Sequence, residues 1–398
     1  MNALERRAVS TLALLYSFRM LGLFMVLPLL ALYAPDLAGA TPILIGLALG
    51  IYGLSQALLQ IPFGWLSDRI GRKPVIVGGL LLFALGSLVA AMADSVTGLI
   101  VGRALQGAGA IASTVMALVA DLTRDEQRTK AMAIVGASIG LAFTLALIVG
   151  PLVASFSGLS GVFYFTVALA LLGIAIVLFM IPSPLAPGRA EIGPRTSLVV
   201  RSLRDSDLMR LNVGVFILHF TLMAAFLVIP GLLEGGLGMS RDSHWQVYLA
   251  VVLLSLLGVL PLMRLAERGG RPRQAFAAGI LLLVLALALL ALVSAPLSIW
   301  LGLWLFFMGF NYLEATLPSL VSKTVFPGGK GTALGIYSTS QFLGTFVGGA
   351  AGGVVIQSWG SAALLLACLA LAVAWLVLAL PKPAVPQALA TEAELPHP

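Results

Sequence analysis

The sequence predicts an all-α polytopic membrane protein with twelve transmembrane helices in two pseudo-symmetric six-helix bundles. First, the 398 residues are 60% hydrophobic and 10% charged, whereas a soluble domain carries about 25% charged residues. Second, apolar segments long enough to cross a bilayer follow one another along the chain. Third, a short charged motif recurs half a chain length away. A water-soluble fold would have too little polar surface to cover such a core.

The apolar segments set the number of helices. A hydrocarbon core about 30 Å thick requires roughly 20 helical residues at a rise of about 1.5 Å each. Twelve segments fit: Val9–Tyr33, Ile43–Leu66, Val75–Ala93, Val96–Leu118, Ala131–Phe156, Gly161–Ile181, Leu208–Leu232, Trp245–Met263, Ala275–Val293, Leu297–Leu320, Thr332–Ile356 and Ser361–Leu380. The first has no small-residue cleavage site, so we expect a retained helix rather than a signal peptide.

The basic residues predict the orientation of these helices. If both termini are cytoplasmic, all but three of the 23 Lys and Arg residues lie on the inner side, as the positive-inside rule requires. The exceptions are Arg19 and Arg103, within helices, and Arg241 in the loop after helix 7. The net charge of +7 therefore reflects membrane topology, and we expect no nucleic-acid partner. We expect a multi-pass protein of the bacterial inner (cytoplasmic) membrane.

Four regions follow from these segments. Residues 1–181 are predicted to form an N-terminal six-helix bundle and residues 208–380 a C-terminal one. Residues 182–207, rich in Pro and Arg, are a cytoplasmic linker with a short amphipathic helix around Leu198–Leu203. Residues 381–398 are rich in Pro and Ala with little to bury, which predicts a disordered cytoplasmic tail.

An internal repeat relates the two bundles. The acid-Arg-x-Gly-Arg core that begins at Asp68, after helix 2, recurs 199 residues later at Glu267, after helix 8. A second echo joins the entry of helix 5, at Ala131, to the entry of helix 11, at Ala333. Two duplicated halves are typical of a rocking transporter whose substrate site lies between the repeats.

The motif after helix 2 resembles a known family signature. It reads Gly64-x-x-x-Asp68-Arg69-x-Gly71-Arg72-Lys73 and is similar to the cytoplasmic motif of the major facilitator superfamily. Further matches are similar to its drug:proton antiporter branch: Leu21-Gly22 with Pro28, Arg103-x-x-Gln106-Gly107-x-Gly109, and Gly150-Pro151. Some bacterial inner-membrane relatives carry an additional soluble C-terminal domain. Because this sequence ends at Pro398 after a short tail, we expect no counterpart here.

Four ionisable residues lie within predicted helices: Arg19, Arg103, His219 and Glu314. Charge inside hydrocarbon is costly, so each one calls for a functional or structural explanation. The resemblance implies that their helices line the transport cavity and that Arg103 takes part in proton coupling. The alternative is a fixed positive charge, satisfied by Gln106 or by backbone carbonyls.

The other three ionisable residues also have two interpretations each. Arg19 can attract an anionic substrate or pair with Glu314, or it can be a static donor. Glu314, on one helix face with Asn311, can carry a proton or extend toward Lys323 at the membrane surface. His219 can relay protons near neutral pH or serve as a hydrogen-bonding residue.

The signature motif predicts a conformational latch formed by Gly64, Asp68, Arg69, Gly71, Arg72, Lys73 and Asp121. Asp68 can cap the positive N-terminal end of helix 11 from the opposite half, while Arg72 can reach Asp121. Such contacts would hold the halves together when the cavity opens outward. Alternatively, the basic residues only set topology.

The remaining candidates for the substrate cavity are polar or aromatic: Tyr52, Gln56, Gln60, Asn311, Tyr337 and Gln341. Pockets with aromatic walls and few charges suit amphipathic organic solutes.

The favoured function is proton-coupled export of amphipathic small molecules by alternating access, as in drug efflux. The alternative is a proton-coupled transporter of organic anions or sugars, because Arg19 stands where exporters of cations carry an acid. A receptor or scaffold would not need the latch motif. We expect no enzyme, cofactor or metal site, since neither HExxH nor a phosphate loop is present. The expected partners are substrate, protons and lipid, and we expect a monomer driven by a proton gradient.

Overall fold

The computed structural model describes residues 1–181, 195–293, 295–326 and 329–379, and these are almost entirely helical. The helices are α1 (Ala3–Phe24), α2 (Leu27–Tyr33), η1 (Ala34–Asp36), α3 (Pro42–Ile70), α4 (Arg72–Ala91), α5 (Val96–Ala108), α6 (Ala112–Asp121), α7 (Asp125–Phe179), α8 (Arg195–Arg204), α9 (Ser206–Leu237), η2 (Arg241–Ser243), α10 (His244–Glu267), α11 (Pro272–Leu292), α12 (Pro296–Thr324) and α13 (Lys330–Ala379). No strand occurs in these ranges.

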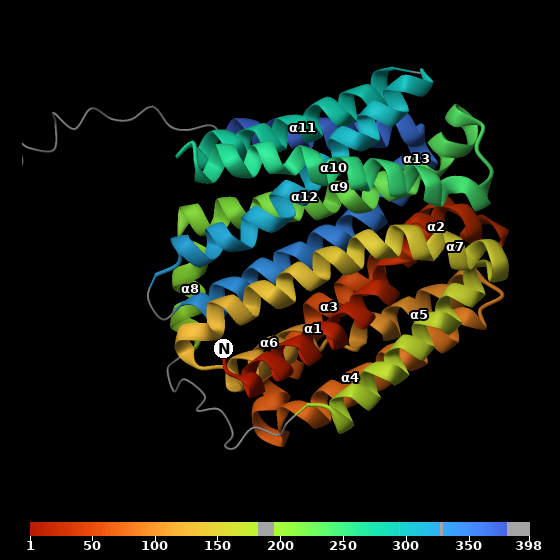
Figure 1. The fold of residues 1–398 in the computed structure, drawn as a ribbon. Coiled ribbons are helices and arrows are strands. Elements are labelled where there is room, and N and C mark those ends of the chain that lie inside the picture. The colour runs from red at the N-terminus through yellow and green to blue at the C-terminus, as the bar shows by residue number, and fades with distance from the viewer. Residues whose placement is uncertain (182–194, 294, 327–328, 380–398) are drawn as a thin grey trace, which may run out of the picture.

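The described chain makes twelve crossings. Ten segments are long and apolar enough to span a membrane, but α7 and α13 contain 55 and 50 residues. Each reverses at one glycine, Gly158 with φ 65° and Gly360 with φ 84°, where a side chain would be strained. Figure 1 shows α7 turning back on itself near α2. The twelve predicted helices are therefore confirmed.

Two of the predicted helices are interrupted. The first is divided into α1 and α2 at Met25, just before Pro28, whose missing N–H cannot continue the helical ladder. The fourth is divided into α5 and α6 at Gly109. Gly109 packs directly on the backbone carbonyl of Gly79 in α4, which leaves no room for a side chain. Each interruption frees backbone groups near the middle of the membrane.

The helices form two groups, α1–α7 and α9–α13, which contact each other mainly through α3 and α13. We call the side that holds the N-terminus, α8 and the 268–271 turn the basic face. The side that holds the Gly158 and Gly360 turns is the far face. Figure 1 shows the N-terminus and α8 together at the left.

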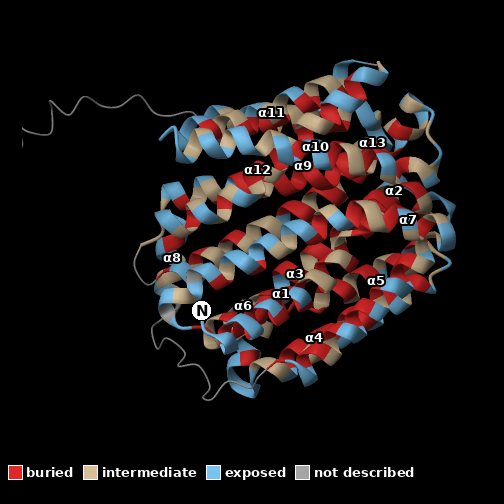
Figure 2. Ribbon diagram, in the orientation of Figure 1, coloured by how far each residue is buried: buried red, intermediate tan, exposed pale blue. Residues whose placement is uncertain are grey.

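The two groups touch in the far half and part toward the basic face. In the far half, a Cβ on Gly50 of α3 would lie 2.6 Å from the carbonyl oxygen of Phe346 in α13. Toward the basic face, a Cβ on Gly140 or Gly331 would meet no described atom within 4 Å. Figure 2 shows many exposed positions along the stretch of α7 that begins at the basic face.

The linker that connects the two helix groups along the chain is described only in part. Helix α8 contains the short helix predicted around Leu198–Leu203 and packs against α9 and α13. Residues 182–194 and the predicted disordered tail, 381–398, lie outside the described residues.

Candidate functional site

Glu314, His219 and Gln341 meet at the inner surface of the second helix group. They come from α12, α9 and α13. His219 Nε2 lies 3.6 Å from Glu314 Oε2, and Gln341 Nε2 lies 2.8 Å from His219 Nε2 and 3.3 Å from Glu314 Oε1. The Gln341 amide therefore bridges the two titratable groups.

The hydrogen bonds assign the proton on the imidazole. His219 Nδ1 lies 3.1 Å from the Val215 carbonyl oxygen, which can only accept, so Nδ1 carries the hydrogen. With Gln341 Nε2 as the donor, His219 Nε2 is the acceptor of that hydrogen bond. Glu314 Oε2 has no hydrogen-bond partner among the described residues, although that atom is buried. A proton arriving on either group would create a donor aimed at the other.

A cluster of aromatic rings lies on the far side of this site and joins the two helix groups. Phe143 of α7 lies 5.1 Å from Phe24 of α1. It also lies 5.5 Å from Phe310 and 6.5 Å from Phe307, both on α12. The Phe310 ring in turn lies 6.0 Å from the His219 imidazole. Because Phe143, Phe307 and Phe310 are buried, this cluster separates Glu314 from the far face.

Arg19 lies in the first group and donates hydrogen bonds to residues of that group. Its Nη2 donates to Tyr52 Oη at 3.0 Å, to Gln56 Oε1 at 2.9 Å and to the Gly109 carbonyl at 2.9 Å. That carbonyl lies at the α5–α6 interruption. The pair with Glu314, one of three alternatives, is therefore not formed in this structure, and the contacts are those of a static donor. Arg19 is 1% exposed, and its Nε and Nη1 have no hydrogen-bond partner among the described residues.

Arg103 is held by an amide and the backbone. Its Nη1 donates to Gln106 Oε1 at 2.8 Å and its Nε to the Ala48 carbonyl at 3.3 Å. Its guanidinium also lies 5.2 Å from the centre of the Tyr52 ring. These contacts match the alternative of a fixed, satisfied charge. Within the described residues neither Arg19 nor Arg103 forms an ion pair with a carboxylate.

The other cavity candidates do not gather at one point. Asn311 shares α12 with Glu314 but donates to Ser255 Oγ of α10 at 3.0 Å, whereas Glu314 faces α9 and α13, not Lys323. Gln60 is buried on α3, and Tyr337 is buried one turn from Gln341 on α13. The Gln60 Oε1 and Tyr337 Oη atoms have no described partner.

The signature motif lies at the basic face. Asp68 is in the last turn of α3 rather than in a loop. Arg72 Nε lies 3.0 Å from Asp121 Oδ2, and Arg72 Nη1 lies 2.5 Å from Asp68 Oδ1. Lys73 donates to the Ile181 carbonyl at the end of α7. The Arg72–Asp121 contact is therefore present, but it joins α4 to α6 within the first group and is formed while the groups are parted at the basic face. A latch between the groups stays a prediction, and it would depend on the proposed cap of Asp68 on α13.

An ion pair between the groups at the far face was not predicted. Arg241 Nη1 lies 3.1 Å from Asp36 Oδ2 in the first group, and Arg241 Nε lies 3.0 Å from Glu234 Oε1 in the second. The sequence did carry a signal, because Arg241 is the single loop residue that departs from the predicted distribution of basic residues. Phe143 had no comparable signal among many apolar neighbours.

Comparisons with known proteins agree with this arrangement. The sequence profile described as Major Facilitator Superfamily matches residues 12–325 and 211–397. The inner membrane transport protein YajR of Escherichia coli K12 is 46% identical over 379 residues, 94% of this chain and 83% of that protein. The multidrug resistance protein MdtH of Aeromonas hydrophila is 28% identical over 84% of each chain.

Solved structures show the same fold at low sequence identity. The human organic anion transporter MFSD10 (TETRAN) has a TM-score of 0.69 and 22% identity, over 95% of this chain and 100% of that one. A mutant of the nucleoside transporter NupG has a TM-score of 0.74 and 14% identity, over 94% and 98%. The relatives are transporters, not enzymes, and this chain belongs to the Major Facilitator Superfamily of membrane transporters.

Proposed function

We propose that this transporter exports amphipathic small molecules in exchange for protons, by alternating access. The observation that carries the proposal is the Glu314 site. Its side chain is 33% exposed within a membrane-spanning helix, where a carboxylate is costly and usually functional. Its Oε2, which has no hydrogen-bond partner among the described residues, lies 3.6 Å from His219 Nε2. Two groups that can bind a proton therefore lie side by side. In this structure the titratable neighbour of Glu314 is His219.

The proton cycle follows from which face of the protein, the basic face or the far face, is closed. With the groups parted toward the basic face, Glu314 exchanges protons with that side, while the Phe143–Phe310 contact excludes the far side. When the groups part at the far face instead, a proton from there neutralises Glu314. The neutral pair costs less to enclose than an isolated charge, so the return to the present state carries the proton with it.

The substrate class is inferred from the walls of the site. Phe143 and Phe310 supply apolar surface beside the polar groups of Gln341 and Glu314. Such walls suit amphipathic solutes, and the name of MdtH, a multidrug resistance protein, agrees with this class. We infer a monomer that takes its energy from the proton gradient and uses no cofactor.

A second candidate is transport of organic anions or sugars, coupled to protons. Arg19 favours the anions, because two of its buried guanidinium nitrogens have no described partner and it forms no ion pair with a carboxylate of the described residues. An anionic group entering the site would gain charge-assisted hydrogen bonds there. MFSD10 is named an organic anion transporter.

We also propose the orientation and the membrane. The positive-inside rule makes the basic face cytoplasmic, so both termini lie in the cytoplasm. The name of YajR, an inner membrane protein, favours the bacterial inner membrane.

The experiment compares wild type with Glu314→Gln in liposomes under an imposed pH gradient, with a panel of lipophilic cations and organic anions. Gln keeps the size of the side chain but cannot carry the proton. We expect the variant to exchange labelled substrate at a similar rate and to lose accumulation driven by pH, because exchange needs no net proton cycle.

Glu126→Gln, which removes an exposed carboxylate at the start of α7, is the matched control and should accumulate substrate normally. If Glu314→Gln still concentrates substrate with pH as the only driving force, Glu314 does not couple transport to protons. Asp36 and Asp121 would then be tested next.

A further inference from the structure

Helix α8 exposes two arginines together with two apolar side chains. Val200 is 43% and Leu203 47% exposed, and Arg201 and Arg204 are exposed beside them. Residues three and four apart neighbour each other on a helix, so these four side chains form one mixed surface. Exposed basic and apolar side chains in this combination are typical of helices that lie at a membrane surface.

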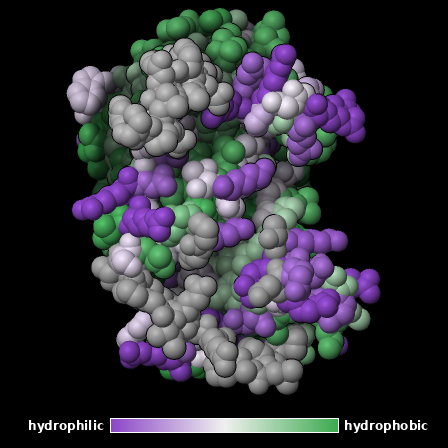
Figure 3. All heavy atoms as spheres, turned by 90° about the vertical axis from the view of Figure 1, so that its left-hand side faces the viewer, coloured by the Kyte–Doolittle hydropathy of each residue, from purple (hydrophilic) through white to green (hydrophobic). Residues whose placement is uncertain are grey.

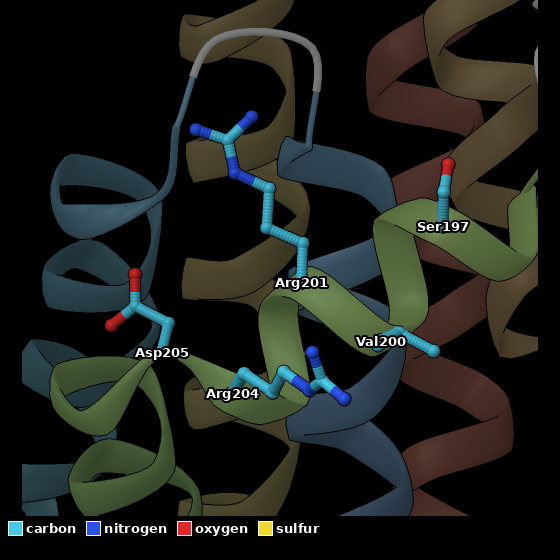
Figure 4. A pocket seen from close by; sticks show the side chains of 5 residues that line it. All are labelled: Ser197, Val200, Arg201, Arg204 and Asp205. Carbon is cyan, nitrogen blue, oxygen red and sulfur yellow. The ribbon is translucent and has the colours of Figure 1, made fainter.

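A cavity of about 600 Å³ adjoins this surface. Figure 4 shows its five lining side chains, which come from α8 and from the turn into α9: Ser197, Val200, Arg201, Arg204 and Asp205. Figure 3 views the basic face, where hydrophilic side chains gather. Because α8 leads through Asp205 directly into a membrane-spanning helix, the cavity lies at the boundary between membrane and water.

Neither Arg201 nor Arg204 forms an ion pair in the part of the chain that the structure describes. Arg201 lies 4.1 Å above the Phe326 ring, which fixes the guanidinium and leaves its charge. The Asp205 carboxylate is already engaged, because Oδ1 accepts from the backbone N–H groups of Asp207 and Leu208 and caps α9.

We propose that Arg201 and Arg204 bind the phosphate of an anionic phospholipid in the leaflet at the basic face, while Val200 and Leu203 contact its acyl chains. A planar guanidinium binds phosphate oxygens in pairs, and basic side chains near an anionic membrane surface are attracted to it. A bound lipid would hold the linker between the two helix groups at the membrane surface.

Native mass spectrometry of the purified full chain tests this proposal. The probes are short-chain phosphatidylglycerol, phosphatidylcholine with the same chains, and inorganic phosphate. We expect wild type to prefer phosphatidylglycerol by on the order of tenfold, and Arg201→Gln/Arg204→Gln to lose that preference. Arg201→Lys/Arg204→Lys should keep most of it. Arg210→Gln, which removes an exposed arginine that is paired with Asp207, is the matched control and should behave as wild type.

Other results would overturn the proposal. Equal binding of the two lipids to wild type would show that the cavity does not select anionic headgroups. An undiminished preference in the double Gln variant, with a monodisperse gel-filtration profile, would place the lipid elsewhere. If inorganic phosphate displaced the lipid at equal concentration, the site would bind a free anion and the apolar contacts would not contribute.

Discussion

Arg241 and Asp36 join the two helix groups at the far face, with 3.1 Å between Nη1 and Oδ2. The pair forms where the groups touch, and it must break when they part at this face. It therefore stabilises the present state and not the opposite one.

Arg241→Gln should raise the population that is open at the far face. Arg241 and Asp36 are 39% and 65% exposed, and exposed pairs contribute about 0.2–1 kcal/mol, so the shift should not exceed about fivefold. Spin labels at Thr97→Cys and Leu297→Cys, both exposed near the far face, would report the distance between the groups.

Glu234→Gln is the control for that change. It removes a partner of Arg241 within the second group and leaves the pair with Asp36, so it should not open the far face. Equal effects of the two variants would show that the pair between the groups has no special role.

Gly50→Ala should have a larger effect on the same equilibrium. The new Cβ would lie 2.6 Å from the Phe346 carbonyl oxygen, which belongs to the backbone and cannot move aside without shifting α13. Overpacking of this kind costs about 1–3 kcal/mol, and only in the state in which α3 touches α13. The same spin labels should report an increase of about 5–150-fold in the open population.

Gly78→Ala in α4 is the matched control, because a Cβ there meets no atom within 4 Å. The seam between α3 and α13 would not be the closing contact if both alanine variants gave the same distance distribution.

Most of the helices could be predicted from the sequence, because membrane helices must be long, apolar and bordered by basic residues. The interruption near Met25 was harder to predict, since its main sequence signal is Pro28. The reversal at Gly158 depends on a positive φ that many glycines of this chain do not adopt.

The partners within the site were harder to predict than its members. His219, Glu314 and Gln341 each stood out as polar residues in apolar helices. Which of them meet depends on how α9, α12 and α13 are rotated about their axes. One residue corresponds to about 100° of rotation at 3.6 residues per turn, so span boundaries uncertain by a residue or more cannot fix a contact. The sequence therefore left the partner of Arg19 open, between Glu314, a substrate anion and static hydrogen-bond acceptors.

Arg72→Ala and Asp68→Ala should insert normally and transport more slowly, by roughly tenfold, because the predicted cap of Asp68 on α13 would form only when the groups close at the basic face. Their partners in this structure include Asp121. Initial uptake rates at matched expression would measure the effect. Arg273→Ala, which removes another exposed basic residue from the basic face, should leave the rate unchanged. If both motif variants transported at the wild-type rate, the latch hypothesis would be wrong and the basic residues of the motif would only set the topology.

Arg19→Gln distinguishes the two candidate substrate classes. If the guanidinium binds an anionic group, its loss should raise KM about tenfold or more for aromatic carboxylates, and much less for their uncharged amides. Competition assays with such matched solutes would measure the difference. A uniform loss for both would indicate that Arg19 only supports Tyr52 and Gln56.

The reversals at Gly158 and Gly360 have a consequence for how the chain enters the membrane. In each, two crossings are separated by a single non-helical residue. This connection is too short for the first helix to cross the membrane completely before the second helix enters it. The two helices of each pair should therefore insert together, as a preformed hairpin. A reporter domain inserted at either glycine would have to separate the pair, and it should impair biogenesis before any effect on transport could be measured.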